Sequence, residues 1–331
     1  MARARKVDAD AIVAHIDALP GKLKLDPRRE QWSHSVFRFD DIRNAARILQ
    51  RGSLLSRAKC DAEGLGYVDA ADRQVIAQSP EAHRYARLYF RPRTPTQYWM
   101  EGVRRQVDIR HQAHCPVPVF LLFDSRRLLT REEAVFSTQN MARAATETGR
   151  TARFFKERLD FALIYHDGAI RESEDKDQIV ACRQAEVLFE DGVDLDDLRE
   201  VVCRSGPERD TLLTLLGENA AAWAGVIRLE RIGERLFERT QGTFVQDIRL
   251  DGDHVMVEMV PHIGPYVVKL EAWDAANRDV LANRARDIAV IRPVYRAPLD
   301  RRAERVYLRL KIDDALAYEG LLRQSTVVGP S

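Results

Sequence analysis

The sequence predicts an α+β protein that ends in an all-β domain. Up to about residue 215, helical periodicity alternates with short apolar runs of strand-like composition, such as Arg87–Phe90 and Val117–Phe123. Beyond Gly242, several short segments instead alternate polar and apolar residues with a period of two, as half-buried strands do. We therefore expect three parts: an α+β domain at 1–215, a helical linker at 216–241 and a β-sandwich domain at 242–325.

Residues that typically begin or end helices mark the expected elements of the first two parts. A helix is expected from about Asp8 to Leu19, where a proline follows it. After a strand near Val36–Phe39, Asp40 or Asp41 caps a helix that Gly52 ends. The remaining expectations are a long loop from about Lys59 to Pro80, a helix at Thr151–Leu163, a strand within Ile179–Phe189, a short helix and strand at Asp194–Cys203, and a helical run at Glu208–Arg239.

The C-terminal part predicts paired strands. Phe244–Leu250 and His254–Val260 flank Asp251-Gly252, a dipeptide typical of tight hairpin turns. Tyr266–Trp273 and Val306–Ile312 alternate with period two. The residues expected to point inward are Val268, Leu270, Val306, Leu308, Leu310 and Ile312. Short alternating strands of this kind are typical of a small antiparallel sandwich, and we expect an immunoglobulin-like one.

Charge is segregated along a chain whose formal net charge is only +1. From Arg84 to Arg131 there are ten arginines and three acids, a balance of +7, whereas Glu157 to Glu200 has a balance of −9. Near-neutrality excludes a protein that coats polyanions in bulk, while the basic block is compatible with one localised anion-binding face. A genome rich in G and C would also favour arginine over lysine, and a solvated surface is the other explanation for the block.

Cysteine usage and hydropathy limit the class of protein further. Four widely spaced cysteines form no Cys-x-x-Cys pair, so neither a structural zinc site nor a disulfide framework is expected. No apolar run approaches the roughly 20 residues that cross a bilayer. The basic N-terminus is followed by Asp8 and Asp10 where a signal peptide would need an apolar region. A soluble, cytoplasmic protein is expected.

The segment from Leu88 to Tyr98 combines two arginines and two prolines between aromatic residues. Proline fixes φ and lacks a backbone donor, so the segment predicts a strand end that leads into a rigid turn. Such a turn would hold Arg91 and Arg93 in set directions, and rigid guanidinium forks suit phosphates or carboxylates. The alternative is a surface turn with solvated arginines.

Glu186 is a carboxylate at the start of an otherwise apolar strand, Glu186 to Phe189. Burying a carboxylate without a partner costs free energy, so a carboxylate at this position needs an explanation. Either it forms a salt bridge with a nearby arginine, or it belongs to a functional site.

Four motifs occur in one order: Phe37-Arg38-Phe39-Asp40-x-Ile42, Leu88–Tyr98, Val135–Asn140, and Arg183-Gln184-Ala185-Glu186. Together they resemble the DarT family of DNA ADP-ribosyltransferase toxins, distant relatives of the diphtheria-toxin and poly(ADP-ribose) polymerase fold. The resemblance covers roughly residues 33–215. It implies an ADP-ribosyltransferase-like core, a mixed sheet with helices, that uses NAD as a substrate and needs no metal.

The resemblance also assigns roles at the NAD site. Glu186 would be the catalytic glutamate, and Tyr89 would pack on the nicotinamide or simply fill the core. Arg38 and Asp40 stand where the family has a His-x-Thr pair that meets the nicotinamide end of NAD, which makes both of them candidate NAD-binding residues. Alternatively, Arg38 could reach the pyrophosphate and Asp40 could do no more than cap the following helix. Arg73 would hold the NAD phosphates, with Arg57 as the alternative.

Nucleic-acid contacts are expected from the turn and from two further motifs. Gln97 could bond a base edge, and Tyr98 could stack on a base. The full set implied by the resemblance is Arg91, Arg93, Gln97, Tyr98, Asn140 and Arg183.

The function implied is transfer of ADP-ribose from NAD to a base of single-stranded DNA, in a toxin–antitoxin or phage-defence system with a macrodomain-type or other antitoxin as partner. An RNA-directed transferase is an alternative acceptor class. Others are a non-catalytic nucleic-acid sensor or adaptor, which the changed His-x-Thr pair would favour, and a protein-directed transferase or NAD glycohydrolase. The C-terminal sandwich is expected to dock a partner.

Overall fold

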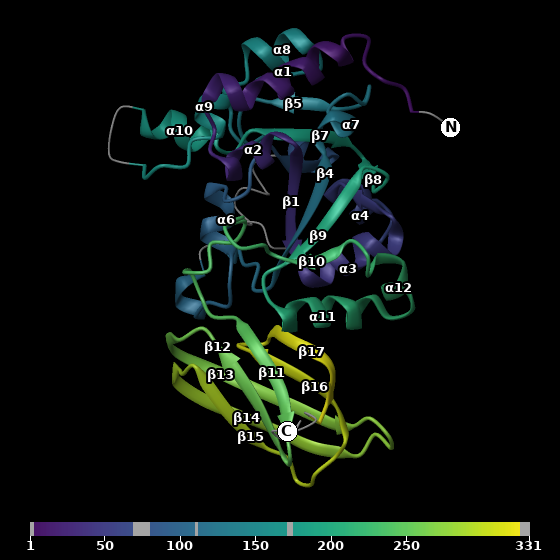
Figure 1. Ribbon diagram of the computed structural model, residues 1–331, viewed down its shortest axis with the longest axis vertical. Coiled ribbons are helices and arrows are strands. Elements are labelled where there is room, and N and C mark those ends of the chain that lie inside the picture. Colours follow the sequence, from purple (N-terminus) through teal and green to yellow (C-terminus); the bar gives the residue numbers. More distant parts are fainter. Residues whose placement is uncertain (1–2, 69–79, 110–111, 171–174, 325–331) are drawn as a thin grey trace, which may run out of the picture.

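A large mixed sheet and two smaller facing sheets organise the chain (Figure 1). The computed structural model describes residues 3–68, 80–109, 112–170 and 175–324, and all structural statements concern these ranges. The upper lobe in Figure 1 is α+β, and the lower lobe is all β. None of the helices in the described ranges combines the length and apolar character needed to cross a bilayer.

The helices are short and lie mostly in the upper lobe. Their bounds are α1 Ala9–Leu23, α2 Pro27–Ser33, α3 Ile42–Arg51, α4 Arg57–Ala62, α6 Pro95–Met100, α7 Ser125–Leu128, α8 Ala152–Glu157, α9 Phe161–Ile164, α10 Lys176–Cys182, α11 Gly206–Leu216 and α12 Ala220–Trp223. Short 3-10 turns are at Pro80–Arg84, Gln106–Asp108 and Gly217–Asn219.

The strands of the upper lobe are β1 Ser35–Asp41, β2 Ser53–Leu55, β3 Tyr85–Tyr89, β4 Pro118–Asp124, β5 Val135–Ser137, β6 Thr148–Gly149, β7 Glu186–Glu190, β8 Gly192–Asp194, β9 Leu198–Cys203 and β10 Ile227–Leu229. Those of the lower lobe are β11 Val245–Asp251, β12 His254–Met259, β13 His262–Asp274, β14 Val280–Ile291, β15 Val294–Pro298, β16 Arg305–Ile312 and β17 Ala315–Arg323.

The large sheet has the order β10-β9-β4-β1-β3-β7-β5-β6 in the described ranges, with only β10 and β9 parallel. β1 pairs along its whole length with β4, and β3 does so with β7. Between β1 and β3, in contrast, the register joins just Phe37 and Tyr89. The two halves of the sheet therefore part beyond this pair, and side chains of β1 and β3 become free to line a cleft.

Local chemistry explains the elements beside this cleft. Asp41 ends β1 and caps α3, because its carboxylate accepts a hydrogen bond from the Arg43 N–H. Gly52 ends α3 at a φ of 76°, a left-handed conformation that glycine adopts without strain. These two boundaries confirm the predicted caps. β4 is apolar from Pro118 to Phe123 and buried over that run, as expected for a strand in the middle of a sheet.

Several predicted elements differ from the observed ones. α1 continues through Pro20 to Leu23, and the helix expected at Thr151–Leu163 is two short helices, α8 and α9. No helix precedes β9 within the described residues of Asp194–Cys203. The helical run expected to Arg239 is wrong beyond α12, since α11 ends at Leu216, α12 ends at Trp223, and β10 then joins the large sheet beside β9. β10 has only three residues, so its sequence contains too little alternation of polar and apolar residues to predict a strand.

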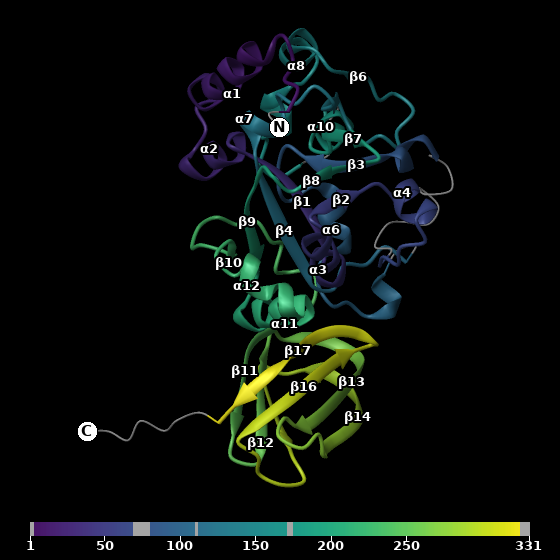
Figure 2. The ribbon, with the colours of Figure 1, turned by 90° about the vertical axis from the view of Figure 1, so that its right-hand side faces the viewer.

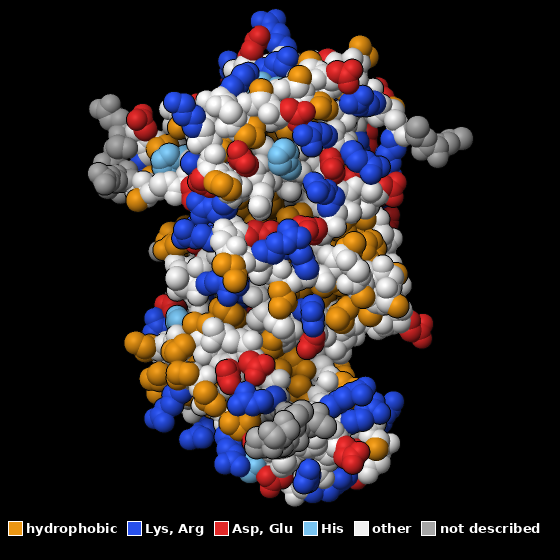
Figure 3. Space-filling view, in the orientation of Figure 1, with side chains coloured by type: hydrophobic (Ala, Val, Ile, Leu, Met, Phe, Trp, Pro, Cys, Tyr) orange, Lys and Arg blue, Asp and Glu red, His pale blue; other side chains and the backbone are white. Residues whose placement is uncertain are grey.

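The lower lobe confirms an all-β C-terminal part. Its sheets have the orders β11-β12-β15 and β14-β13-β16-β17, and both contribute to one hydrophobic core. The predicted hairpin turns at Gly252, and the residues predicted to point inward are buried, with Val268 only partly so. Hydrophobic side chains gather on the left of this lobe in Figure 3, and Ile263, Val290 and Val294 are among its exposed apolar residues.

The two lobes pack closely on each other. α11 lies on β17, and Figure 2 shows the helix above that strand. Val103, from the segment after α6, is fully buried in the core of the lower lobe and pairs with Thr243. A Cβ on Gly102 would come 3.3 Å from Gly242, so the backbones nearly touch there. The guanidinium of Arg204 lies 4.0 Å from the ring centre of Phe244.

Candidate active site

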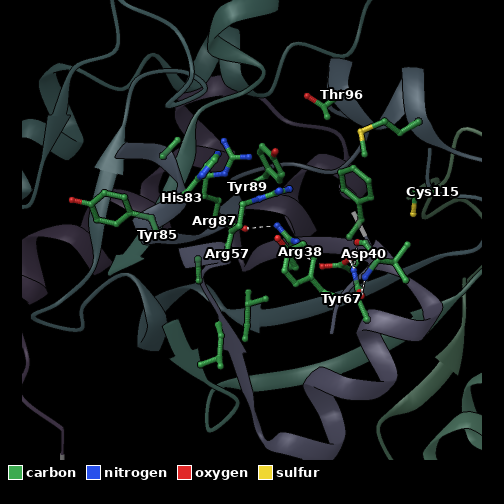
Figure 4. Close-up of a pocket in the computed structure, with 18 of the residues that line it drawn as sticks. Arg38, Asp40, Arg57, Tyr67, His83, Tyr85, Arg87, Tyr89, Thr96 and Cys115 are labelled. Atoms are coloured by element: carbon green, nitrogen blue, oxygen red, sulfur yellow. Dashed lines mark hydrogen bonds and ion pairs between the residues drawn. The ribbon is translucent and has the colours of Figure 1, made fainter. Parts of the chain in front are cut away.

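A cavity of about 680 Å³ opens where β1 and β3 part. Arg38, Phe39 and Asp40 of β1 form one wall, and Tyr85 to Tyr89 of β3 contribute the facing one. α3 contributes Asn44, Arg47, Ile48 and Arg51, whose spacing puts them on one helical face. Figure 4 shows Arg38 between Arg87 and Asp40, with Tyr89 close by. The cavity is in the size range of ordinary small-molecule sites.

The lining of this cavity is strongly basic. Among the described residues that line it, Asp40 is the one carboxylate. Its arginines are Arg38, Arg47, Arg51, Arg57, Arg87 and Arg143. Arginine forks bind phosphate oxygens well, so the cavity suits an elongated ligand that carries a pyrophosphate. In the part of the chain that the structure describes, no group of three or more His, Cys, Asp or Glu side chains could hold a metal ion.

Arg38 and Asp40 form a fork at the centre of the cavity. Nε and Nη2 of Arg38 donate to one carboxylate oxygen of Asp40, at 3.0 and 2.5 Å, and Nη1 donates to the carbonyl of Arg87 at 3.1 Å. One N–H on each terminal nitrogen is left for a ligand. The other oxygen of Asp40 accepts from the Asn44 amide at 2.7 Å, and Asn44 also exchanges two hydrogen bonds with the backbone of Val68.

Glu186 has no exposed area and is not among the residues that line the cavity. It stands opposite Tyr89 in the pairing of β3 and β7. Its Oε2 accepts from the Met141 N–H at 2.9 Å, and its Oε1 lies 3.6 Å from Nη1 of Arg87. No hydrogen bond within the described residues reaches Oε1. A buried carboxylate oxygen left without a donor is unusual and typical of a reactive group.

Burial raises the pKa of Glu186, because the ionised form loses its hydration. The charge of Arg87, the Met141 N–H and the Tyr89 hydroxyl act in the opposite direction without cancelling this effect. Burial likewise raises the pKa of Tyr89 to about 12, so this phenol stays protonated. The arrangement therefore gives a carboxylate that is a better proton acceptor than an ordinary glutamate.

The raised pKa of Glu186 has a consequence for stability. A carboxyl whose pKa is higher in the folded than in the unfolded state favours folding while it is protonated, and this contribution disappears as pH rises through the folded pKa. We therefore expect Glu186→Gln to be more stable than the native chain at pH 8, with a difference that shrinks towards pH 5. Urea unfolding at the two pH values measures it, and a difference independent of pH would contradict the assignment.

The turn after β3 does not present its polar side chains as predicted. Arg91 is buried, donates to the carbonyls of Ile164 and His166, and lies over the ring of Trp32. Gln97 is buried too and donates to the Leu236 carbonyl. The expected nucleic-acid contacts of both residues are not supported, because intramolecular partners already use their polar groups.

Arg93 is also engaged within the protein. Its Nη2 lies 3.0 Å from Glu238, and its Nη1 lies 3.7 Å from Asp167. Two carboxylates thus neutralise the charge that was expected to meet a phosphate, and that expectation is not supported.

The other predicted residues are distributed around the cavity. Asn140 lines it, and its amide oxygen accepts from Arg87 at 3.4 Å. Arg183 is half-buried and bonds to His166 and Gly168, away from the cavity lining. Tyr98 is exposed at the surface of α6. Arg57 lines the cavity, as its role as the alternative to Arg73 requires, whereas Arg73 itself lies outside the described residues.

Residues that the sequence did not single out complete the lining. Arg47 and Arg51 are four positions apart on α3, a spacing that could have pointed to a basic helical face. Arg143 follows Asn140 on the turn that also holds Glu186 through Met141. Trp99 comes directly after the predicted Tyr98, and nothing in its neighbours indicates that it reaches the cavity.

Comparison with known proteins agrees with this geometry. A family model described as "ssDNA thymidine ADP-ribosyltransferase, DarT" matches residues 37–230, more than half of the chain. Among solved structures, the DarT of Thermus sp. 2.9 in complex with ADP-ribosylated ssDNA is similar at 16% identity and a TM-score of 0.50, covering 62% of this chain and 96% of that one. The same protein with NAD⁺ gives 16% identity, a TM-score of 0.48, and coverage of 62% and 97%. No curated protein sequence matches.

Proposed function

The chain belongs to the DarT family of ssDNA thymidine ADP-ribosyltransferases, and we propose that Glu186, buried opposite the cavity-lining Tyr89, is the residue that carries this activity. The protein is an NAD-dependent enzyme that transfers ADP-ribose to a base of single-stranded DNA. The observation that supports the assignment to Glu186 is its buried Oε1, which accepts no hydrogen bond from the described residues and lies 3.6 Å from Arg87, in a carboxyl whose pKa is raised.

The chemistry needs an anion and a base at one place. When the bond between nicotinamide and ribose breaks, nicotinamide leaves with the electron pair and positive charge develops on the ribose, which a nearby carboxylate stabilises. A new bond then forms from a base nitrogen to the ribose. Thymidine has a single ring N–H, and its proton would pass to Glu186 as general base. Tyr89, opposite Glu186, would pack against the nicotinamide end.

The remaining parts of NAD would be held by the basic lining. Arg38 has two N–H groups free of the fork with Asp40, and they suit phosphate or carbonyl oxygens. Asp40 would orient Arg38 rather than touch the ligand. Arg57, or Arg73, would complete the phosphate contacts. Asn140, Arg183 and Tyr98 remain our proposed contacts of the DNA strand.

The direct test is transfer of label from NAD to nucleic acid. The full chain is incubated with NAD labelled in the adenosine and with single-stranded DNA, the same strand without thymidine, duplex DNA, or RNA. Label should enter only the thymidine-containing single strand, since ring atoms inside a duplex are inaccessible. Label on none of the acceptors would overturn the proposal, and nicotinamide release without any acceptor would favour a glycohydrolase.

Replacing Arg38 by lysine tests the fork. Lysine keeps the charge but cannot donate to Asp40 and a ligand in a fixed plane, and charge-assisted hydrogen bonds are worth about 1.5–3 kcal/mol. We expect Arg38→Lys to raise the KM for NAD roughly tenfold or more while changing the KM for DNA little. Steady-state kinetics with each substrate varied in turn measures the two constants, and an unchanged KM for NAD would remove Arg38 from the NAD site.

The lower lobe suggests a binding role. Lettered in chain order, its sheets read A-B-E and D-C-F-G, a Greek-key order that supports an immunoglobulin-like sandwich at 242–325. The exposed apolar side chains on this lobe support its use in docking a partner. We propose that the chain is the toxin of a toxin–antitoxin pair whose antitoxin is a macrodomain-type protein. Co-purification with that protein, lost when Ile263→Asp and Val290→Asp are combined, would support docking here.

A further inference from the structure

Two neighbouring aromatic side chains on α6 are exposed. Tyr98 keeps 40% and Trp99 43% of its surface in contact with solvent. Their rings meet edge to face, with centres 5.1 Å apart and planes at 89°. Tryptophan is usually well buried because its ring contributes a large apolar area to a core. An exposed pair of aromatic rings beside a cavity therefore offers a surface on which a ligand could bind.

Trp99 lies at the cavity. Thr96, Trp99 and Met100 line it, and their spacing of three and four residues puts them on one face of α6. On the same face, the Thr96 hydroxyl donates to the amide oxygen of Gln184 at 3.0 Å. Gln184 also lines the cavity and precedes Glu186 by two residues. Helix α6 is thus joined, through this one hydrogen bond, to the segment that directly precedes β7 and its proposed general base.

The helix that presents the two rings is held rigidly. Gln97, between them and the turn, is fully buried and donates to Leu236 O and Glu101 Oε2, each at 2.8 Å. Thr94 caps the first turn by accepting from the Gln97 N–H. At the other end, Arg104 donates to the carbonyls of Tyr98 and Glu101. Both ends of a six-residue helix are therefore satisfied, and the rings need little reordering on binding.

We propose that Trp99, braced by Tyr98, is a stacking platform for an unpaired nucleobase of single-stranded DNA at the mouth of the cavity. The proposal rests on the proposed function for the identity of the ligand. Every base has a flat face, and stacking on an exposed aromatic ring is how proteins hold single strands. The neighbouring basic lining would attract the phosphates of the same strand. Trp99 acts here as a binding and positioning residue.

The test compares two substitutions of Trp99 in the full chain. Binding of a fluorescent thymidine-containing oligonucleotide is followed by anisotropy without NAD, so that no transfer occurs. Trp99→Leu removes one base stack and should bind the oligonucleotide about 5- to 150-fold more weakly than the native chain. Trp99→Phe keeps an aromatic face, so its affinity should fall no more than about threefold. Trp273→Leu, the same change on β13 of the other lobe, is the matched control and should bind as the native chain does.

Three results would overturn the inference. They are native DNA affinity in Trp99→Leu, equal losses in the leucine and phenylalanine variants, and a loss of NAD affinity with DNA affinity unchanged. The last would put a ring of NAD on Trp99 instead. The transfer assay separates the two proposals. If the native chain labels no DNA although binding still depends on Trp99, the proposed function fails alone. If transfer occurs and the KM for DNA is unchanged in Trp99→Leu, the present inference fails alone.

Discussion

Glu186→Gln is expected to lower the rate of ADP-ribose transfer about 10²- to 10⁴-fold, the usual contribution of a general base, with further loss from the missing negative charge. Glutamine keeps the size of the side chain and one oxygen that can accept from the Met141 N–H, so the turn from Asn140 to Arg143 should keep its place. The KM for NAD should change little, because the arginines that line the cavity remain. Transfer of label to a thymidine oligonucleotide under saturating NAD measures the rate.

Glu190→Gln is the matched control for this experiment. Glu190 lies on the same strand, four residues further on, but it is exposed and pairs with Arg84 at the surface. Its amide variant should transfer ADP-ribose at nearly the native rate. If Glu186→Gln also kept most of the activity, the carboxylate would be a buried structural charge and the general base would have to be sought elsewhere in the cavity.

The largest expected effect on stability comes from Arg204→Ala. Arg204 is almost fully buried, pairs with Glu208 and Glu101, and covers the ring of Phe244. Removing it leaves two buried carboxylates without their cation, which typically costs about 3–5 kcal/mol. Lost packing between the guanidinium and Phe244 adds to that cost. Urea unfolding followed by far-UV circular dichroism gives the change in the free energy of unfolding.

Arg209→Ala serves as the comparison for that change. Arg209 lies on α11 beside Glu208, is exposed, and pairs loosely with Asp210 at 3.6 Å. Exposed ion pairs contribute about 0–1 kcal/mol, so this variant should unfold nearly as the native chain does. A similar small effect in both variants would mean that water reaches the Arg204 cluster.

Much of the site follows from local pattern. The alternation of β1 puts Arg38 and Asp40 on one face, and both line the cavity, as strand geometry requires. Glu186 and Tyr89 stand opposite each other since two apolar strands pair in register. The caps of α3 and the hairpin at Gly252 rest on residue types whose conformational preferences are strong.

The binding partners of the arginines in the turn could not be predicted from the local sequence. What a guanidinium binds depends on carboxylates and carbonyls brought near by the fold, not on its neighbours in sequence. Arg93 meets Glu238, 145 residues away, and Arg91 meets carbonyls more than 70 residues away. The prolines lead into a capped helix that bears Tyr98 and Trp99, rather than into a pair of open cationic forks.

The position of Val103 determines how this architecture could have been assembled. The residue follows the cavity-lining helix by three positions, yet its side chain belongs to the core of the other lobe. An unrelated domain joined after Gln241 would have to provide an apolar pocket for the Val103 side chain. It would also need a residue without a side chain where Gly242 approaches Gly102. The lobes are therefore not exchangeable parts. A lineage that gained or lost the sandwich would also have had to change the segment that directly follows the cavity-lining helix α6.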